Sequence, residues 1–142
     1  METTPNTEVF KRVIEEGFNR GNFDAWDDCF PPTFREHQYG LPSTLAEFKR
    51  TIAGLRGAMP DLTLTIDEMV TSGDKVWVRM TSRGTHLGPF MGFTPTGKSF
   101  TITVMDVCRF EAGRIVEHWG VPDRFALLHQ LGLLTTPAAA RR

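Results

Sequence analysis

The spacing of apolar residues changes once along this chain, near Asp61, and this change determines the fold class. Before Asp61, apolar residues recur every three or four positions, as Val9, Phe10, Val13, Ile14 and Phe18 do. After it they alternate with polar residues, as Leu62, Leu64 and Ile66 do. Helices followed by a run of strands are typical of α+β proteins. The sequence therefore predicts an α+β fold in which N-terminal helices cover one face of a curved antiparallel sheet.

Capping residues and chain breakers predict where the elements begin and end. Asn6 or Thr7 is expected to cap the first helix, and Gly21 to end it. The next expected elements are a helix at 23–29, a short strand or extended segment at 34–39, and a helix opened by Ser43 or Thr44. They are followed by a hairpin turn at 72–75, a breaker-rich loop at 87–97, strands at 98–110 and 114–121, and a short closing helix after residue 122. Residues 1–134 are predicted to form one domain, and residues 135–142 a disordered tail.

Composition excludes several classes of function. The 142 residues carry 16 Lys and Arg against 17 Asp and Glu, a formal net charge of -1, so nothing indicates a nucleic-acid partner. No apolar run approaches the roughly 20 residues that a membrane span needs, and the first residues lack the apolar core of a signal peptide. The two cysteines, Cys29 and Cys108, have no metal-binding spacing. We therefore expect a cytoplasmic protein with no nucleic-acid or membrane partner.

A carboxylate falls on the apolar face of one predicted strand. Asp106 shares its parity with Ile102, Val104 and Cys108. A carboxylate among such neighbours is costly unless it is partnered. Two interpretations follow: Asp106 is a structural hydrogen-bond node, bonded to Arg79, a threonine or the backbone, or it lines a pocket.

Alternation along the other strands assigns further residues to faces. In the strand at 114–121, Glu117 and Trp119 are expected to face inward and His118 outward. The residues Trp77, Met105 and Val107 are expected on the face opposite the interior. Because an exposed apolar patch usually marks an interface, we expect a homodimer with the two sheets packed face to face.

A series of short motifs resembles one known family over roughly Val9 to Leu134. The motifs occur in this order: Met59-Pro60-Asp61-Leu62, Gly73-Asp74-Lys75-Val76, Arg83-Gly84-Thr85-His86, Phe90-Met91-Gly92 and Pro95-Thr96-Gly97. The C-terminal run is Phe110-Glu111-Ala112-Gly113-Arg114-Ile115-Val116-Glu117-His118-Trp119, followed by Asp123 and Gln130-Leu131-Gly132. In this order the motifs resemble SnoaL-like polyketide cyclases, which belong to the nuclear-transport-factor-2-like superfamily.

The resemblance implies a cone-shaped sheet wrapped around the N-terminal helices, with an apolar cavity. It also implies a cyclase that closes a ring of a polyketide-like ester by intramolecular aldol condensation, with neither a metal nor an organic cofactor. We therefore expect a cofactor-independent lyase or isomerase acting on a small apolar, polycyclic or polyketide-like carbonyl compound. Two alternatives remain on the same cone: an epoxide or lactone hydrolase, and a non-catalytic small-molecule-binding module.

The resemblance also suggests which residues form the site. Asp123 is expected to be the general acid/base. His86 is expected to have an orienting role because it ends a strand just before the breaker-rich loop. The alternatives are that Asp123 faces solvent in the first turn of a helix and that His86 pins the neighbouring loop. The residues expected to bind substrate are His37, Phe90, Phe93, Asp106 and Trp119. The family's cyclases use a histidine near the penultimate strand, and here Met105, Asp106 and Val107 occupy that place.

Overall fold

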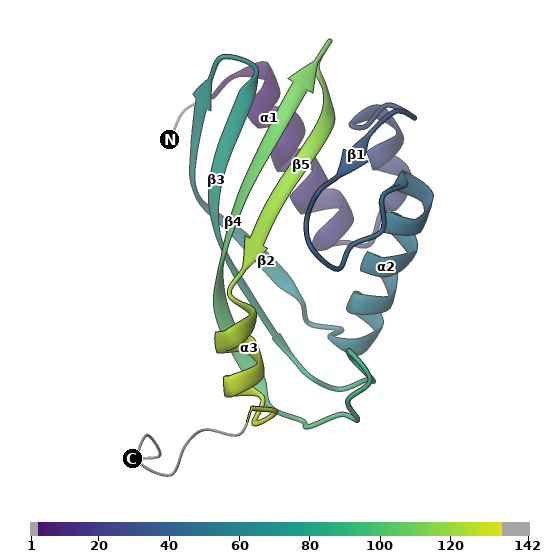
Figure 1. The fold of residues 1–142 in the computed structure, drawn as a ribbon, viewed down its shortest axis with the longest axis vertical. Helices are drawn as coiled ribbons and strands as arrows, with labels where there is room; N and C mark the ends of the chain where they lie inside the picture. Colours follow the sequence, from purple (N-terminus) through teal and green to yellow (C-terminus); the bar gives the residue numbers. More distant parts are fainter. Residues whose placement is uncertain (1–2, 135–142) are drawn as a thin grey trace.

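Five helical segments and a sheet make up the computed structural model, which describes residues 3–134 (Figure 1). The predicted tail at 135–142 lies outside the described residues. The N-terminal helical segments are α1 (Pro5–Arg12), the π-helix η1 (Val13–Phe18) and the 3-10 helix η2 (Phe23–Asp28), and α2 (Leu45–Ala58) follows later. Among residues 3–134, no helix is long and apolar enough to cross a membrane.

Caps set the beginnings of the two main helices. The expected caps Asn6 and Thr7 are wrong by two to three residues, because α1 begins at Pro5 with Thr4 as its cap. The Thr4 hydroxyl accepts a hydrogen bond from the backbone N–H of Thr7, and proline is well suited to the first helical position. Thr44 caps α2 as predicted, since its hydroxyl accepts from the backbone N–H of Glu47.

The sheet has five strands in the order β1-β5-β4-β3-β2. They are β1 (Arg35–Glu36), β2 (Thr63–Ser72), β3 (Lys75–Thr85), β4 (Ser99–Glu111) and β5 (Arg114–Pro122). The pairs β2–β3, β3–β4 and β4–β5 are antiparallel, and the two-residue β1 adds to β5 in parallel. The short helix α3 (Arg124–Gln130) follows β5 directly.

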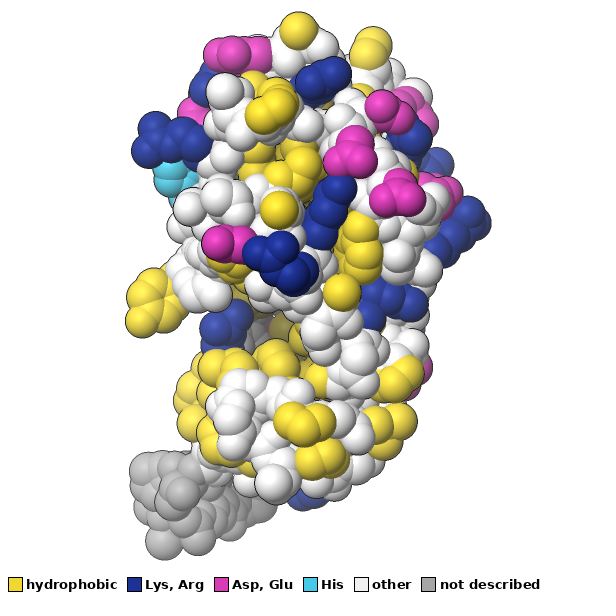
Figure 2. All heavy atoms as spheres, turned by 90° about the vertical axis from the view of Figure 1, so that its right-hand side faces the viewer, with side chains coloured by type: hydrophobic (Ala, Val, Ile, Leu, Met, Phe, Trp, Pro, Cys, Tyr) yellow, Lys and Arg dark blue, Asp and Glu magenta, His cyan; other side chains and the backbone are white. Residues whose placement is uncertain are grey.

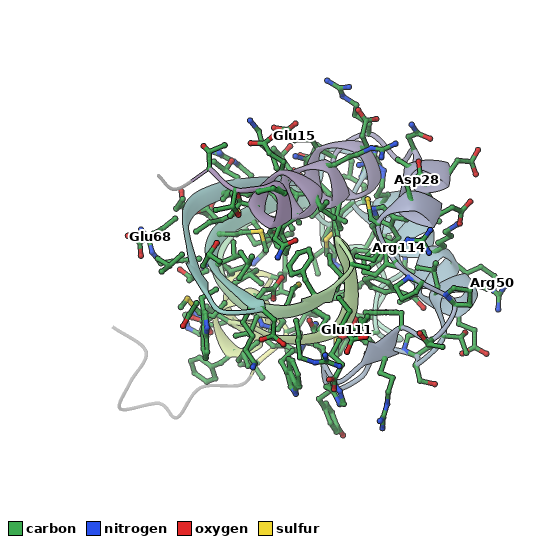
Figure 3. The ribbon with its side chains drawn as sticks, turned by 90° about the horizontal axis from the view of Figure 1, so that it is seen from above. Glu15, Asp28, Arg50, Glu68, Glu111 and Arg114 are labelled. Atoms are coloured by element: carbon green, nitrogen blue, oxygen red, sulfur yellow. The ribbon has the colours of Figure 1, made fainter. Side chains whose placement is uncertain are left out.

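The helices lie in the hollow of the curved sheet, which confirms the predicted α+β fold. In Figure 1, α1 and α2 lie on the same side of the strands, and α3 lies below the end of β5, beside the lower part of β4. Seen from above in Figure 3, the sheet curves around the interior, and labelled charged side chains such as Glu68 and Arg50 point away from it. Most of the buried apolar side chains lie between these two layers.

A β-bulge in β5 reverses the inward and outward positions along the rest of that strand. Arg109 pairs with Glu117 and Phe110 with Ile115, so Val116 is an extra residue opposite β4. Beyond the bulge, His118 lines the interior and Trp119 lies on the outer face. The predicted parity of β5 is therefore wrong, because it assumed uninterrupted alternation from Ile115 onward.

The helical layer is organised around one tryptophan. Trp26 is fully buried, and its indole Nε1–H donates to the backbone carbonyl of Val13 at 3.0 Å. Its ring stacks on Phe48 of α2 with a centroid separation of 4.9 Å. Gly17 lies directly against the indole, where a Cβ atom would overlap the ring. The close approach of η1 to Trp26 therefore depends on the missing side chain of Gly17.

We predict opposite stability effects for the same substitution at two glycines. Gly17→Ala should lower the free energy of unfolding by roughly 1–3 kcal/mol, because the buried Trp26 ring has no room to move. Gly57→Ala in α2 places its methyl group where no atom lies within 4 Å, so it should be neutral or stabilise by up to about 1 kcal/mol through helix propensity. Urea unfolding of both variants measures the difference, and equal stabilities would contradict this packing.

Candidate functional site

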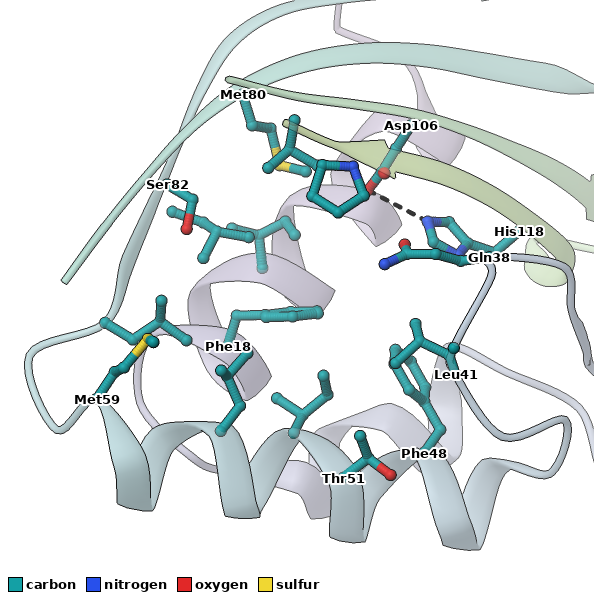
Figure 4. A pocket seen from close by; sticks show the side chains of 18 of the residues that line it. Phe18, Gln38, Leu41, Phe48, Thr51, Met59, Met80, Ser82, Asp106 and His118 are labelled. Atoms are coloured by element: carbon teal, nitrogen blue, oxygen red, sulfur yellow. Dashed lines mark ion pairs between the residues drawn. The ribbon is translucent and has the colours of Figure 1, made fainter. Parts of the chain in front are cut away.

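A cavity of about 470 Å³ lies between the concave face of the sheet and the helices (Figure 4). Its walls are mainly apolar side chains from α1, η1, α2 and the three long strands β2, β3 and β4, among them Phe10, Ile14, Phe48, Ile52, Met80 and Ile102. In Figure 2 the surface is hollowed on the side of α2, with hydrophobic atoms in the recess. The volume falls within the roughly 300–1,000 Å³ of small-molecule sites.

Polar side chains enter this apolar chamber mainly at one end. Asp106 comes from β4, His118 from β5 and Gln38 from the segment that follows β1, and Figure 4 shows the three close together. The Ser82 hydroxyl lies apart from them on β3. Few polar groups in an otherwise apolar cavity are typical of a site that fixes the orientation of a ligand.

Gly120 makes room for the three polar side chains. It is the register partner of Asp106 across β4 and β5. A Cβ atom here would lie 2.5 Å from Asp106 Oδ1 and 2.9 Å from His118 Cε1, and would also overlap the Gln38 amide. Any larger residue at this position would force the three groups apart.

His118 lies between two carboxylates. Its Nε2 is 3.2 Å from Asp106 Oδ2, and its Nδ1 is 2.6 Å from Glu36 Oε1. The Glu36 side chain is fully buried, and the same Oε1 accepts a hydrogen bond from the backbone N–H of Gln38 at 2.9 Å. Strand β1 places Glu36 here because it pairs with β5, with Glu36 in register with His118.

The charges of this cluster keep the histidine protonated. Burial alone would lower the pKa of His118, but the charge of Asp106 and the hydrogen bonds to Asp106 and Glu36 outweigh it and raise the pKa to about 10. At neutral pH the ring is therefore an imidazolium, and both of its N–H groups donate, one to each carboxylate.

One oxygen of each carboxylate has no hydrogen-bond partner among residues 3–134. These atoms are Asp106 Oδ1 and Glu36 Oε2, and both are buried. Leaving a buried acceptor unpaired is costly, so such atoms are uncommon in folded proteins. Because Asp106 also lines the cavity, its Oδ1 is a carboxylate oxygen available to a bound ligand.

The two residues predicted to be catalytic lie in different environments in the structure. Asp123 is exposed and caps α3, where its Oδ1 accepts from the backbone N–H of Ala126 at 3.0 Å. It is not among the residues that line the cavity. His86 is fully buried, and its Nδ1 accepts from the backbone N–H of Thr96 at 3.2 Å. This hydrogen bond connects the His86 ring to the loop at 87–97.

The predicted substrate-binding residues are divided between the two faces of the sheet. Phe90 and Asp106 line the cavity, whereas Phe93 does not and pairs through its backbone with Phe90. His37 and Trp119 lie on the outer side, where their rings stack with centroids 4.8 Å apart. The cause for Trp119 is the bulge in β5, which turns its side chain away from the interior.

Sequence alternation missed three members of the site: Glu36, Gln38 and His118. A trace of the bulge is present in the sequence, since Ile115 and Val116 are consecutive apolar residues that interrupt the alternation. The site also differs from the arrangement that the resemblance implied. The penultimate strand β4 carries Asp106 in place of the expected histidine, and the histidine of the site, His118, lies on the last strand β5.

Comparison with known proteins supports a single family. IdmH from Streptomyces antibioticus, described as a candidate polyketide cyclase, is 31% identical with a TM-score of 0.80, covering 89% of this chain and 98% of IdmH. TsrD from Streptomyces laurentii is 27% identical with a TM-score of 0.85, covering 94% and 99% of the two chains. AclR from Streptomyces galilaeus, described as a candidate hydroxylase, is 28% identical with a TM-score of 0.80, covering 92% and 97%.

No curated protein sequence is significantly similar to this chain. The family model for SnoaL-like polyketide cyclases matches residues 8–131, which includes every strand, the cavity and the Asp106–His118–Glu36 cluster. On the basis of this match, the chain belongs to the SnoaL-like polyketide cyclase family.

Proposed function

We propose that the chain is a cofactor-independent cyclase, or a related lyase or isomerase, that moves protons on an apolar carbonyl compound with Asp106 as acid/base. One observation carries this proposal: Asp106 Oδ1 is a buried carboxylate oxygen without a partner among residues 3–134, on the wall of an apolar cavity. Its other oxygen, Oδ2, is held by the His118 imidazolium at 3.2 Å.

The proposed reaction needs a single carboxylate that gives back the proton it takes. Asp106 Oδ1 removes a proton from the carbon alpha to a carbonyl, and the electron pair of the C–H bond forms an enolate. The enolate carbon then bonds to a second carbonyl carbon of the same molecule. That carbonyl becomes an alkoxide, which takes the proton from Asp106. The carboxylate is regenerated, and no other reactant is consumed.

In this proposal His118 and Glu36 position Asp106 rather than exchange protons with the substrate. With a pKa of about 10, the imidazolium of His118 is a poor base at neutral pH but a strong hydrogen-bond donor. Glu36 fixes the ring through its bond of 2.6 Å to Nδ1. The apolar walls exclude water from the reacting atoms, so the fixed charges of the cluster act more strongly than they would in solvent.

Asp106→Asn should remove the proton-transfer activity with little change in shape. The substrate is unidentified, so we use 2-tetralone in D₂O and follow deuterium uptake at the carbon alpha to its carbonyl by ¹H NMR. General acid/base catalysis contributes about 10²–10⁴-fold, and we expect Asp106→Asn to lower the exchange rate by that order. Thermal unfolding followed by circular dichroism shows whether the variant is folded.

Asp123→Asn is the matched comparison, because asparagine is also a good helix cap and should preserve α3. We expect this variant to exchange at the wild-type rate. Loss of exchange in Asp123→Asn with retention in Asp106→Asn would return the acid/base role to Asp123. A wild-type protein that binds 2-tetralone without exchanging its protons would favour the binding-module alternative.

The outer face of the sheet supports the proposal of a homodimer. Trp77 and Met105 are each 52% exposed, and with Trp119 and Val121 they border a shallow groove of about 220 Å³. These side chains form a contiguous apolar patch on β3, β4 and β5 (Trp77, Met105, Val107, Trp119 and Val121), which is typical of a protein interface. A second copy packed on it would cover the same patch of both chains.

Trp77→Glu should convert this dimer to a monomer, because it places a charge in the apolar interface. Multi-angle light scattering at micromolar concentration should give twice the chain mass of 16.0 kDa for the wild type and that mass once for the variant. Tyr39→Glu, which alters an aromatic side chain that is 93% exposed outside the patch, should remain dimeric. A monomeric wild type would contradict the proposal.

A further inference from the structure

Arg124 is a cation on the wall of the apolar cavity. It is the first residue of α3 and is half-buried. Its Nη1 lies 3.6 Å from the position that a Cβ atom of Gly40 would occupy, so the guanidinium lies against the segment that also brings Gln38 and Leu41 to the cavity. The guanidinium and the Asp106 carboxylate therefore belong to one cavity.

The charge of Arg124 is not neutralised by the rest of the described chain. Within residues 3–134, Arg124 forms neither a hydrogen bond nor an ion pair, although several other arginines do, as in Arg109 with Glu117 and Arg12 with Asp28. The neighbouring Asp123 instead uses its carboxylate to cap α3. The other arginines of residues 3–134 that form no hydrogen bond or ion pair are all exposed: Arg35, Arg50 and Arg114.

Nothing in the local structure explains a cation at this position. The first turn of a helix favours acidic residues, and a cation there is disfavoured by the helix dipole. A half-buried guanidinium also loses part of its hydration. Both effects are unfavourable to the free protein, and both would be offset by an anion bound between Arg124 and the cavity.

We propose that Arg124 binds an anionic substituent of the cavity ligand, a carboxylate or a phosphate ester. This inference rests on the proposed function, according to which the cavity holds a small apolar compound. The planar guanidinium presents paired N–H donors that match the oxygens of either group. The ligand class becomes an apolar compound with an anionic group at one end and its reacting carbonyl at the other.

The arrangement of charges determines which end of such a ligand lies at Arg124 and which end lies at Asp106. An anion beside Asp106 would meet the carboxylates of Asp106 and Glu36, which outnumber the one imidazolium. Along β5, two residues, or about 7 Å, separate Gly120, the register partner of Asp106, from Pro122, and Arg124 follows two residues later. The anion therefore binds at Arg124 while the uncharged carbonyl part reaches Asp106.

Binding of three naphthalene probes tests this inference. Isothermal titration calorimetry at low salt compares 2-naphthoate, 2-naphthyl phosphate and methyl 2-naphthoate, which share the aromatic rings but differ in charge. A hydrogen-bonded ion pair contributes about tenfold in affinity, so the wild type should bind one or both anions about tenfold more tightly than the ester. The probe that gains more identifies the carboxylate or the phosphate as the preferred group.

Two variants distinguish the effect of Arg124 on anion binding from a general effect of positive charge. Arg124→Gln should abolish the preference for the anion while binding the ester as the wild type does. Arg50→Gln removes an equal charge from an exposed residue of α2 and should keep the preference. An unchanged preference in Arg124→Gln, or tighter binding of the ester by the wild type, would overturn the inference.

The same titrations distinguish this inference from the proposed catalytic role. Asp106→Asn, which should lose proton exchange, should retain the preference for the anion because Arg124 is untouched. If Asp106→Asn keeps its exchange activity and Arg124→Gln loses the preference, the acid/base assignment fails and the anion site stands. If exchange is lost in Asp106→Asn and the wild type has no preference, the anion site alone fails.

Discussion

The ion pair between His118 and Asp106, supported by Glu36, is the interaction on which the site depends. Three ionisable side chains are withdrawn from water here, and each is tolerated only because the others are present. Removing one partner would leave a buried charge without compensation, which typically costs about 3–5 kcal/mol. The cluster therefore connects the stability of the domain to the chemistry of its cavity.

Two backbone features bring these side chains together. The bulge at Val116 adds one residue to β5, and a shift of one residue transfers every following side chain to the other face of a sheet. Without it, His118 would face outward and Trp119 would enter the cavity. Gly120 then leaves the space in which Asp106, His118 and Gln38 meet. Neither feature adds a functional group, but both are needed for the cluster to form.

The fold could be predicted from the sequence because it depends on local signals. The change of apolar spacing near Asp61, the Thr44 cap and the turn at 72–75 each correspond to an element in the structure. The position of Asp106 on an apolar face could also be predicted, since buried and exposed residues alternate regularly along β4 on both sides of Asp106. The ordered motifs were sufficient to predict the family.

The site could be predicted only in part, because it depends on contacts between distant residues. Glu36 is separated from His118 by 82 positions and reaches it through a two-residue strand whose parallel pairing with β5 no local signal predicts. Asp123 shows a second difficulty, since an aspartate before a helix is equally suited to a cap and to catalysis. Only the position of its side chain, exposed and bonded to Ala126, distinguishes the two.

The protonation state of His118 is the most direct test of this account. In ¹⁵N-labelled protein, the chemical shifts of the two imidazole nitrogens report whether each carries a proton, and His118→Gln identifies the signals. With a pKa of about 10, both nitrogens of His118 should remain protonated from pH 6 to pH 9. A ring that loses its proton near pH 6.5, the ordinary value for histidine, would contradict the buried ion pair with Asp106 and the mechanism built on it.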